Sequence, residues 1–291
     1  MSQAAFKLDP QLKLGPICMK TNDIDQLLSF YHKDFGLNVI RSDEKTTVLG
    51  RGEKAAEPVL ILNNDEKATD APREAPGLYH FAILVPDRKS LAAAYLTLGN
   101  RGIIFDGYAD HLVSEALYLT DPDGNGIEIY ADRPRSEWKV DDEGVVQMAT
   151  QPLDIDSLIK DAKLNPDGEQ QVFSEGTRIG HVHLKVSDLQ RSIGFYRDLL
   201  GLDLMSYWGS AAFLSAGGYH HHVGINTWES LGGPPIERAW AGMEYFTATV
   251  AKWNFTELSL RLADSPVASG QGSNQLHISD PDNITIIVRA S

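Results

Sequence analysis

Stretches of alternating hydrophobic and polar residues recur along the chain, and each is followed by apolar residues at helical spacing. Two copies, Gly15–Ile40 and Gly180–Met205, align without a gap. In both copies an Asn-Asp or Ser-Asp pair stands where a helix N-cap is expected, and the helical pattern ends at a glycine, in Phe-Gly-Leu or Leu-Gly-Leu. The pattern predicts strand, helix and strand in each copy.

Two further copies are visible at Tyr79–Ile103 and, more weakly, at Tyr245–Val267. Short apolar segments follow each helical pattern, and turn motifs such as DPDGNG and DPDN separate some of them, which predicts hairpin strands. Asp121 and Asp123 of the first motif are interpreted as turn formers. The chain is therefore predicted to be an α+β protein of four modules, each with the order strand, helix and three strands (βαβββ).

A polar and charged segment separates the second module from the third. It predicts a linker over residues 133–176, with one short amphipathic stretch at Asp154–Lys163. The predicted N-terminal domain covers residues 1–132 and holds modules one and two. The predicted C-terminal domain covers residues 177–291 and holds modules three and four.

Composition and charge exclude several classes of protein. The 291 residues are 42% hydrophobic, which is enough for two domains with cores of their own. The formal net charge of -14 disfavours binding to nucleic acid and to anionic membranes. Cys18 stands alone, so an internal disulfide is excluded, and we find neither a secretion signal nor an apolar run long enough to span a membrane. A soluble cytoplasmic protein is expected.

Modules that open with a pattern such as HVHLKVSDLQRSIGFYRDLLGL resemble those of the vicinal oxygen chelate superfamily. That family includes glyoxalase I, the fosfomycin and bleomycin resistance proteins, and the extradiol ring-cleavage dioxygenases. The resemblance covers nearly the whole chain outside the linker. It implies two domains of the glyoxalase/bleomycin-resistance type, in which pairs of modules form incomplete barrels and metal ligands come from the first and last strands of modules.

Candidate ligands stand at those positions in only two of the modules. In module order, the first-strand position holds Pro16, His80, His181 and Tyr245. On the last strands, the second module offers Glu128, whereas the alignment places Ile286 at that position in the fourth. The resemblance therefore implies His80, Glu128 and His181 as metal ligands. Their placement predicts an exchanged pairing, of module two with three and of module one with four.

Two histidines and one carboxylate form a ligand set that leaves three positions of an octahedral ion open. Such a set is typical of non-haem Fe(II) enzymes that bind both substrate and dioxygen. A structural zinc site would instead be closed and would typically recruit cysteine, of which this chain has one. Fe(II) is therefore the expected cofactor, with Mn(II) as the substitute.

The stretch HLVSEALYLTDPDGNGIEIY, from His111 to Tyr130, is similar to the signature of the extradiol dioxygenases. It departs from that signature at Ala109, two residues before the histidine. The resemblance implies that Glu128 binds the metal and that His111 and Tyr118 serve as neighbouring acid–base and hydrogen-bonding groups.

A run of three histidines in YHHHVGIN resembles the segment in which extradiol enzymes carry a further acid–base histidine. The order His221-His222-Val223-Gly224 fits best, which assigns the role to His221. Because the run lies within an apparent strand pattern, alternation would place His220 and His222 on the face opposite to His221.

The resemblance implies extradiol (meta) cleavage of a catechol-type aromatic diol by dioxygen, which gives a 2-hydroxymuconic semialdehyde. The diol and dioxygen would be its partners, together with further copies of the chain, because proteins of this family commonly form homo-oligomers. Aromatic residues near the third module are expected to help line a water-poor pocket, namely Trp208, Phe213, Tyr219 and Trp228. Two alternatives are a glyoxalase-type metal-dependent isomerase and a metal-free protein that sequesters an aromatic ligand.

Overall fold

The structure is a computed structural model. It describes residues 6–51, 57–142, 145–162, 172–263, 265–272 and 274–291. Parts of the predicted linker, residues 143–144 and 163–171, lie outside the described residues.

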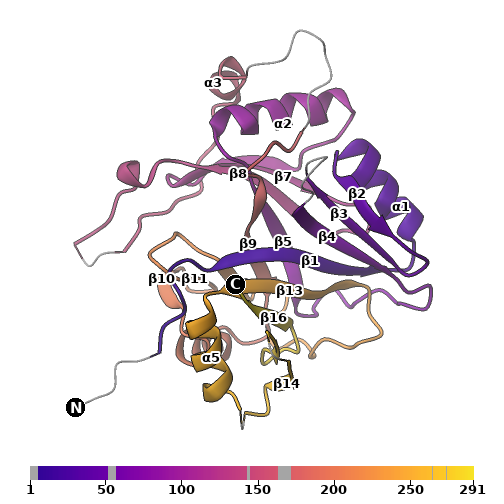
Figure 1. Ribbon diagram of the computed structural model, residues 1–291. Coiled ribbons are helices and arrows are strands. Elements are labelled where there is room, and N and C mark those ends of the chain that lie inside the picture. Colours follow the sequence, from indigo (N-terminus) through magenta and orange to yellow (C-terminus); the bar gives the residue numbers. More distant parts are fainter. Residues whose placement is uncertain (1–5, 52–56, 143–144, 163–171, 264, 273) are drawn as a thin grey trace. The chain divides into compact units, whose positions relative to one another are not determined.

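The elements of the first half of the chain follow the predicted module order (Figure 1). Module one comprises β1 (Lys13–Thr21), α1 (Ile24–Leu28), the π-helical turn η1 (Ser29–Asp34), β2 (Asn38–Ser42), β3 (Thr46–Arg51) and β4 (Glu57–Asn64). Module two comprises β5 (Gly77–Leu84), α2 (Arg88–Asn100), β6 (Gly107–Asp110), β7 (Ser114–Thr120) and β8 (Gly126–Asp132). Two short helices follow, the 3-10 turn η2 (Arg135–Glu137) and α3 (Ile155–Lys160).

The second half repeats the arrangement. Module three comprises β9 (Arg178–Lys185), α4 (Leu189–Ile193), the π-helical turn η3 (Gly194–Leu199), β10 (Asp203–Tyr207), β11 (Ala211–Ser215) and β12 (Val223–Asn226). Module four comprises β13 (Gly242–Val250), α5 (Lys252–Arg261), β14 (Ala268–Gln271), β15 (Gln275–Ser279) and β16 (Thr285–Ala290). The prediction of four βαβββ modules is confirmed.

Aspartates begin most of these helices. Asp23 and Asp188, predicted as caps from the repeat, accept the backbone N–H of the third residue that follows, at 3.0 Å in each case. Asp87 caps α2 in the same way through the N–H of Ser90. A side-chain oxygen at this position satisfies one of the helix donors that have no partner within the helix. The recurring Asp in the sequence therefore sets where each strand gives way to its helix.

The strands of the described residues form two mixed sheets of eight. One has the order β14-β15-β16-β13-β1-β4-β3-β2 and combines modules four and one. The other has the order β10-β11-β12-β9-β5-β8-β7-β6 and combines modules three and two. The predicted exchange of partners is confirmed. We call the first the 1+4 sheet and the second the 2+3 sheet.

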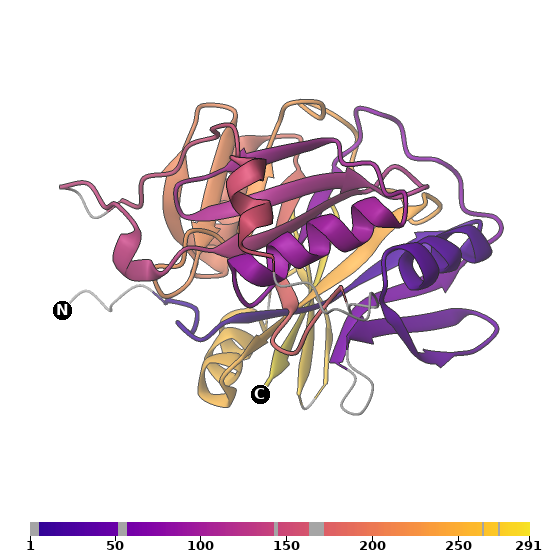
Figure 2. The ribbon, with the colours of Figure 1, turned by 90° about the horizontal axis from the view of Figure 1, so that it is seen from above.

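Contacts divide the chain into two compact units. One unit holds the chain up to Met19, Thr69–Tyr79 and His181–Ser291, and the other holds Lys20–Ala68 and His80–Gly180. In the latter, α2 lies along β7 and β8, and α3 packs against α2 (Figures 1 and 2). The predicted domain limits at residues 132 and 177 stay a prediction.

Each helix covers its sheet with an apolar stripe. In α2, Leu91 and Leu98 are fully buried, and they lie seven residues apart on one helix face. In α5, Phe255 and Leu258 are buried at a spacing of three, and the helix packs against β16.

Candidate metal centre

Two of the predicted ligands belong to neighbouring parallel strands. In the register of β5 and β8, His80 pairs with Gly126 and Ala82 pairs with Glu128. The side chains of His80 and Glu128 therefore lie on one face, and Nε2 of His80 is 3.0 Å from Oε2 of Glu128. Both residues are buried. A buried carboxylate is costly unless a cation or hydrogen-bond donors compensate it.

His181 lies on β9, at the position in module three that His80 holds in module two. The glycine before it is required by packing, because a Cβ at Gly180 would come within 1.9 Å of the Tyr130 hydroxyl oxygen. Candidate ligand atoms of His80, Glu128 and His181 all lie within 4.8 Å of one another, and all three residues are buried.

This donor set fits a divalent metal ion. Imidazole nitrogen and carboxylate oxygen suit iron, manganese and zinc alike, and three protein ligands leave coordination positions for substrate. A bound cation would also compensate the buried charge of Glu128. The three residues therefore form a candidate His-His-Glu metal site, as predicted.

The corresponding positions of the 1+4 sheet lack this set. Tyr245 on β13 pairs with Thr285 on β16, as His80 pairs with Gly126, so the counterpart of Glu128 two residues later is Ile287. The sequence alignment to Ile286 was wrong by one residue: Glu128 and Ile287 each stand seven residues after the first Asp of their turns. Ile286 lies on the opposite face of β16. The conclusion that module four lacks the carboxylate is unchanged.

His111 and Tyr118 are in direct contact. Nε2 of His111 lies 2.7 Å from the Tyr118 hydroxyl, and Nδ1 of His111 lies 2.8 Å from the carbonyl oxygen of Ala149. Tyr118 on β7 is the cross-strand partner of Glu128, and its ring centroid is 5.8 Å from that of His80. The structure thus brings both signature residues next to the candidate ligands. The contact of His111 with Ala149 was not predicted, because no local pattern relates two residues so far apart in the chain.

The DPDGNG turn is organised by its first residue. Asp121 accepts the backbone N–H groups of Asp123 and Asn125 at 3.0 and 2.8 Å, which confirms it as a turn former. It also accepts the hydroxyl of Tyr31 from module one at 2.7 Å. Burial raises the pKa of Asp121 and, more strongly, that of Tyr31. The turn that precedes β8 is therefore held in place by a hydrogen bond from module one.

The three consecutive histidines precede β12 and do not lie within a strand. The expectation that His220 and His221 point to opposite faces is wrong, because their Nδ1 atoms are 2.8 Å apart. The ring of His221 lies 4.0 Å, centroid to centroid, from that of His181, and the ring of His220 lies 6.1 Å from it. His222 contacts the hydroxyl of Ser215 instead, at 2.9 Å. Strand alternation could not apply because the segment turns before the strand begins.

A row of rings leads from His221 along this unit. The ring centroid of Phe213 lies 5.0 Å from that of His221 and 5.6 Å from that of His183, and the ring centroid of Trp228 lies 5.4 Å from that of His183. Of the other two aromatic residues predicted to lie here, Trp208 contacts Phe213 and Tyr219 contacts His220. His183 was not predicted as a site residue. Its position two residues after His181 on a strand indicated that both side chains lie on the same face of the sheet.

The amide of Asn226 fixes the state of His183. Oδ1 of Asn226 accepts the backbone N–H of Trp228 at 3.1 Å, so its Nδ2 faces Nε2 of His183 at 3.0 Å. Because an amide N–H donates, Nε2 of His183 accepts and the proton of the neutral ring resides on Nδ1.

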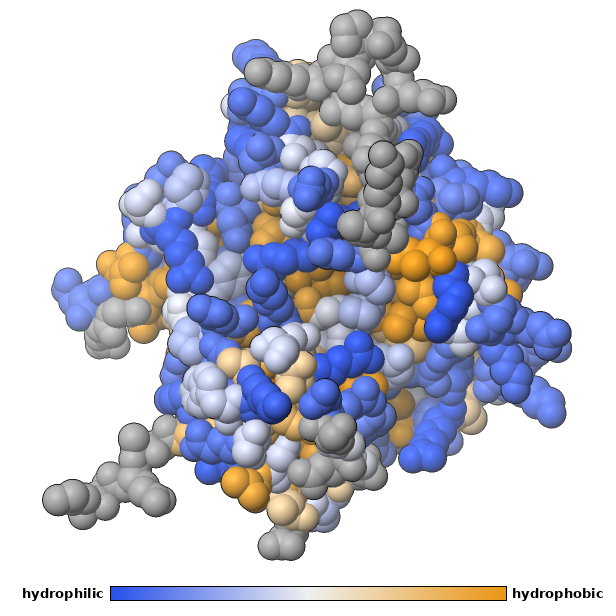
Figure 3. Space-filling model, viewed as in Figure 1, coloured by the Kyte–Doolittle hydropathy of each residue, from blue (hydrophilic) through white to orange (hydrophobic). Residues whose placement is uncertain are grey.

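Hydrophilic side chains cover much of the face shown in Figure 3, and the hydrophobic areas there are separate. Within the described ranges, every helix is too short or too polar to cross a bilayer.

Comparison with known proteins defines the class. The chain belongs to the Glyoxalase/Bleomycin resistance protein/Dioxygenase superfamily, whose model matches residues 13–129 and 178–288. It is 40% identical over 272 residues to catechol-2,3-dioxygenase of Bacillus subtilis (strain 168), which covers 92% of this chain and 93% of that protein.

Solved structures share the fold at low sequence identity. A crystal structure from Bacillus subtilis subsp. subtilis str. 168 superposes with a TM-score of 0.60 at 12% identity, covering 99% of this chain and 86% of that one. Glyoxalase I from Zea mays superposes with a TM-score of 0.55 at 18% identity, covering 96% and 92%. At these identities the likeness supports the fold alone.

Proposed function

We propose that this protein is an extradiol dioxygenase, which cleaves a catechol-type aromatic diol with dioxygen and forms a 2-hydroxymuconic semialdehyde. The observation that carries the proposal is the buried cluster of His80, Glu128 and His181. It occurs in a chain that is 40% identical, over nearly its full length, to a catechol-2,3-dioxygenase.

We infer that these three residues hold Fe(II), with Mn(II) as the substitute. When bound, the ion would supply a common centre for the diol oxygens and dioxygen and would pass charge between them. Three protein ligands leave room for both molecules. A four-ligand glyoxalase-type site would need a further protein ligand, whereas the cluster formed by the described residues has three.

His221 is the proposed general base for a hydroxyl proton of the diol. Its ring lies against that of His181, so a diol bound at the candidate site would be within its reach. Nδ1 of the neighbouring His220 lies 2.8 Å from Nδ1 of His221, so the two rings are held together.

His111 and Tyr118 are proposed to act as one hydrogen-bonded pair. The Ala149 carbonyl can only accept, so Nδ1 of His111 carries a proton and Nε2 accepts the hydroxyl of Tyr118. This chain holds the Tyr118 oxygen beside His80 and Glu128, where it can accept a hydrogen bond from the diol.

The test loads the purified protein with Fe(II) under anaerobic conditions and adds catechol in aerated buffer. Oxygen uptake and the yellow absorbance of the semialdehyde are recorded together. We expect one molecule of dioxygen to be consumed for each ring cleaved, and both signals to be lost in Glu128→Ala. Glu244→Ala, which removes a carboxylate from β13 of the 1+4 sheet, is the matched control and should retain both signals.

Two results would redirect the assignment. Iron that binds without cleavage across several diols would favour the isomerase, and absence of metal binding would favour the ligand-sequestering protein. We also propose a homo-oligomer, as is common in the family, which light scattering coupled to size-exclusion chromatography measures directly.

A further inference from the structure

His111 stands in a three-residue loop between β6 and β7. The next residue, Leu112, has a left-handed backbone with φ of 69°. Leucine rarely adopts this conformation because its Cβ crowds the neighbouring carbonyl. Strained residues of this kind persist only where the surroundings hold them, and they gather at functional sites. The contacts that hold this loop are therefore informative.

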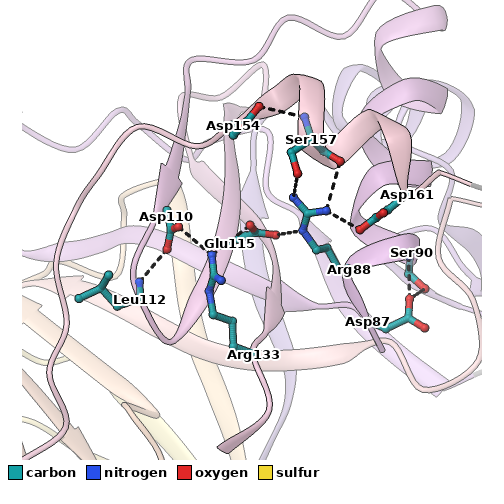
Figure 4. A network of polar contacts seen from close by, with 10 residues as sticks. All are labelled: Asp87, Arg88, Ser90, Asp110, Leu112, Glu115, Arg133, Asp154, Ser157 and Asp161. Carbon is teal, nitrogen blue, oxygen red and sulfur yellow. Dashed lines mark hydrogen bonds and ion pairs between the residues drawn. The ribbon is translucent and has the colours of Figure 1, made fainter. Parts of the chain in front are cut away.

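One side of the loop is held by an ion-pair network (Figure 4). Oδ1 of Asp110 accepts the backbone N–H of Leu112 at 2.8 Å, and Oδ2 of Asp110 accepts from Nη2 of Arg133 at 2.7 Å. The same guanidinium donates to Oε1 of Glu115 at 3.1 Å. Glu115 is buried on β7, so Arg133 ties the strained loop to a fixed point of the sheet.

The network continues into the segment that was predicted to be a linker. Arg88 on α2 donates to Oε2 of Glu115 and, at its other end, to the carboxylate of Asp161 and the backbone carbonyl of Ser157 (Figure 4). Ser157 and Asp161 belong to α3 and the residue that caps it. This part of the segment is thus bonded to module two through charged groups.

The same segment reaches the loop directly. Asp110 and Gln151 exchange two backbone hydrogen bonds, at 2.8 and 2.9 Å, as antiparallel strands do. This pairing brings the carbonyl of Ala149 to Nδ1 of His111. A backbone carbonyl cannot donate, so the contact selects the Nδ1–H tautomer and leaves Nε2 to accept from Tyr118.

We propose that Asp110 and Arg133 are positioning residues for His111, and that they work by keeping its ring against the Ala149 carbonyl. The segment around residues 149–161 then contributes to the site by orienting His111, in addition to connecting modules two and three. The tautomer of His111, and with it the direction in which the Tyr118 hydroxyl donates, depends on the contacts of Asp110 with Arg133 and with the backbone of Leu112. The inference rests on the proposed function in taking His111 and Tyr118 as groups of the active site.

Two arginine variants separate positioning from general stability. Arg133→Gln breaks the bond to Asp110, and Arg88→Gln removes a guanidinium that is equally exposed (31% and 32% of the side chain) and pairs with the same Glu115, but does not contact Asp110. Arg133→Lys restores a cation that can reach Asp110. The tautomer is read from imidazole ¹⁵N shifts in protein loaded with diamagnetic Zn(II), with the His111 signals identified by their loss in His111→Gln.

We expect the Nδ1–H tautomer in the wild type and in Arg88→Gln, and a mixture of tautomers in Arg133→Gln. In the iron-loaded protein, kcat for catechol should fall roughly tenfold in Arg133→Gln with KM little changed, and should recover in part in Arg133→Lys. Equal behaviour of the two glutamine variants in both measurements, or an Nε2–H tautomer in the wild type, would overturn the proposal. The ¹⁵N result does not depend on turnover, so a wild type that cleaves no diol would count against the proposed function alone.

Discussion

The 2+3 sheet and the 1+4 sheet are built from modules of the same kind, yet within the described residues only the 2+3 sheet carries a candidate ligand set. His80, Glu128 and His181 of the 2+3 sheet correspond to Tyr245, Ile287 and Pro16 of the 1+4 sheet. The face that carries His80 and Glu128 also holds a buried apolar cluster that includes Ala82, Leu84 and Tyr130. The comparison indicates that equivalent strand positions carry candidate ligands in one sheet and other side chains in the second.

Features present in both sheets are structural. Gly15 and Gly180 occupy equivalent positions, and at each a Cβ would collide with a side chain of another strand, Thr247 or Tyr130. Tyr196 bonds Asp280 in modules three and four, as Tyr31 bonds Asp121 in modules one and two. Because these features recur in modules with and without candidate ligands, they are folding devices and not catalytic ones.

The largest difference between the sheets should appear in metal binding. We expect His80→Ala and His181→Ala each to weaken metal binding roughly 100-fold or more, because each removes a direct ligand. Tyr245→Ala alters the counterpart of His80 and should leave the metal content unchanged. Metal per chain after equilibrium dialysis, measured by mass spectrometry, checks this. Equal metal loss in Tyr245→Ala would erase the proposed asymmetry.

Core positions should behave alike in both sheets. Phe81 directly follows His80 and Phe246 directly follows its counterpart Tyr245, and both phenylalanines are buried. Phe81→Ala and Phe246→Ala should each lower the free energy of unfolding by about 3 to 5 kcal/mol, since each leaves a cavity. Urea denaturation measures both. A much smaller cost for Phe246 would mean that the 1+4 sheet is packed less tightly.

The two buried turn aspartates should make the stability depend on pH in the same direction. Burial raises the pKa of Asp280 to about 7, and it raises that of Asp121 in the same direction. A raised carboxyl pKa means that the native state favours the protonated form. The stability from this group is present at low pH and is lost as pH rises from about 4 to about 7, by up to about 4 kcal/mol.

Asp280→Asn removes this titration while it keeps a hydrogen-bonding side chain. The unfolding free energy of the variant should therefore fall less between pH 5 and pH 8 than that of the wild type, and Asp121→Asn gives the comparison in the other half. Denaturant unfolding at both pH values measures these changes. Equal changes in the unfolding free energy of the wild type and of Asp280→Asn would contradict the raised pKa of Asp280.

The smallest effects should come from the tyrosines that bond these aspartates. Tyr31→Phe and Tyr196→Phe each remove a buried hydroxyl donor, and each should cost about 1 to 3 kcal/mol of unfolding free energy. Thermal unfolding of the pair checks whether the two halves are equivalent. A cost confined to one variant would show that the Tyr–Asp contact serves only one half.

Local patterns in the sequence determined much of this protein. Apolar periodicity, the aspartate caps and the repeated glycines defined the four modules, because these features act over a few residues. The positions of His80, Glu128 and His181 within equivalent modules were enough to predict which modules share a sheet. Side-chain type and strand position carry that information directly.

Only the tertiary structure decided how the surrounding groups are arranged. The contact of His220 with His221 depends on a turn that ends just before β12, where alternation no longer applies. Ala149 stands 38 positions after His111, and Asp121 stands 90 positions after Tyr31. Such contacts join residues with no shared local pattern, because they arise from the packing of whole elements. The candidate ligands could be predicted from the sequence, whereas the groups that orient them are determined by the tertiary packing.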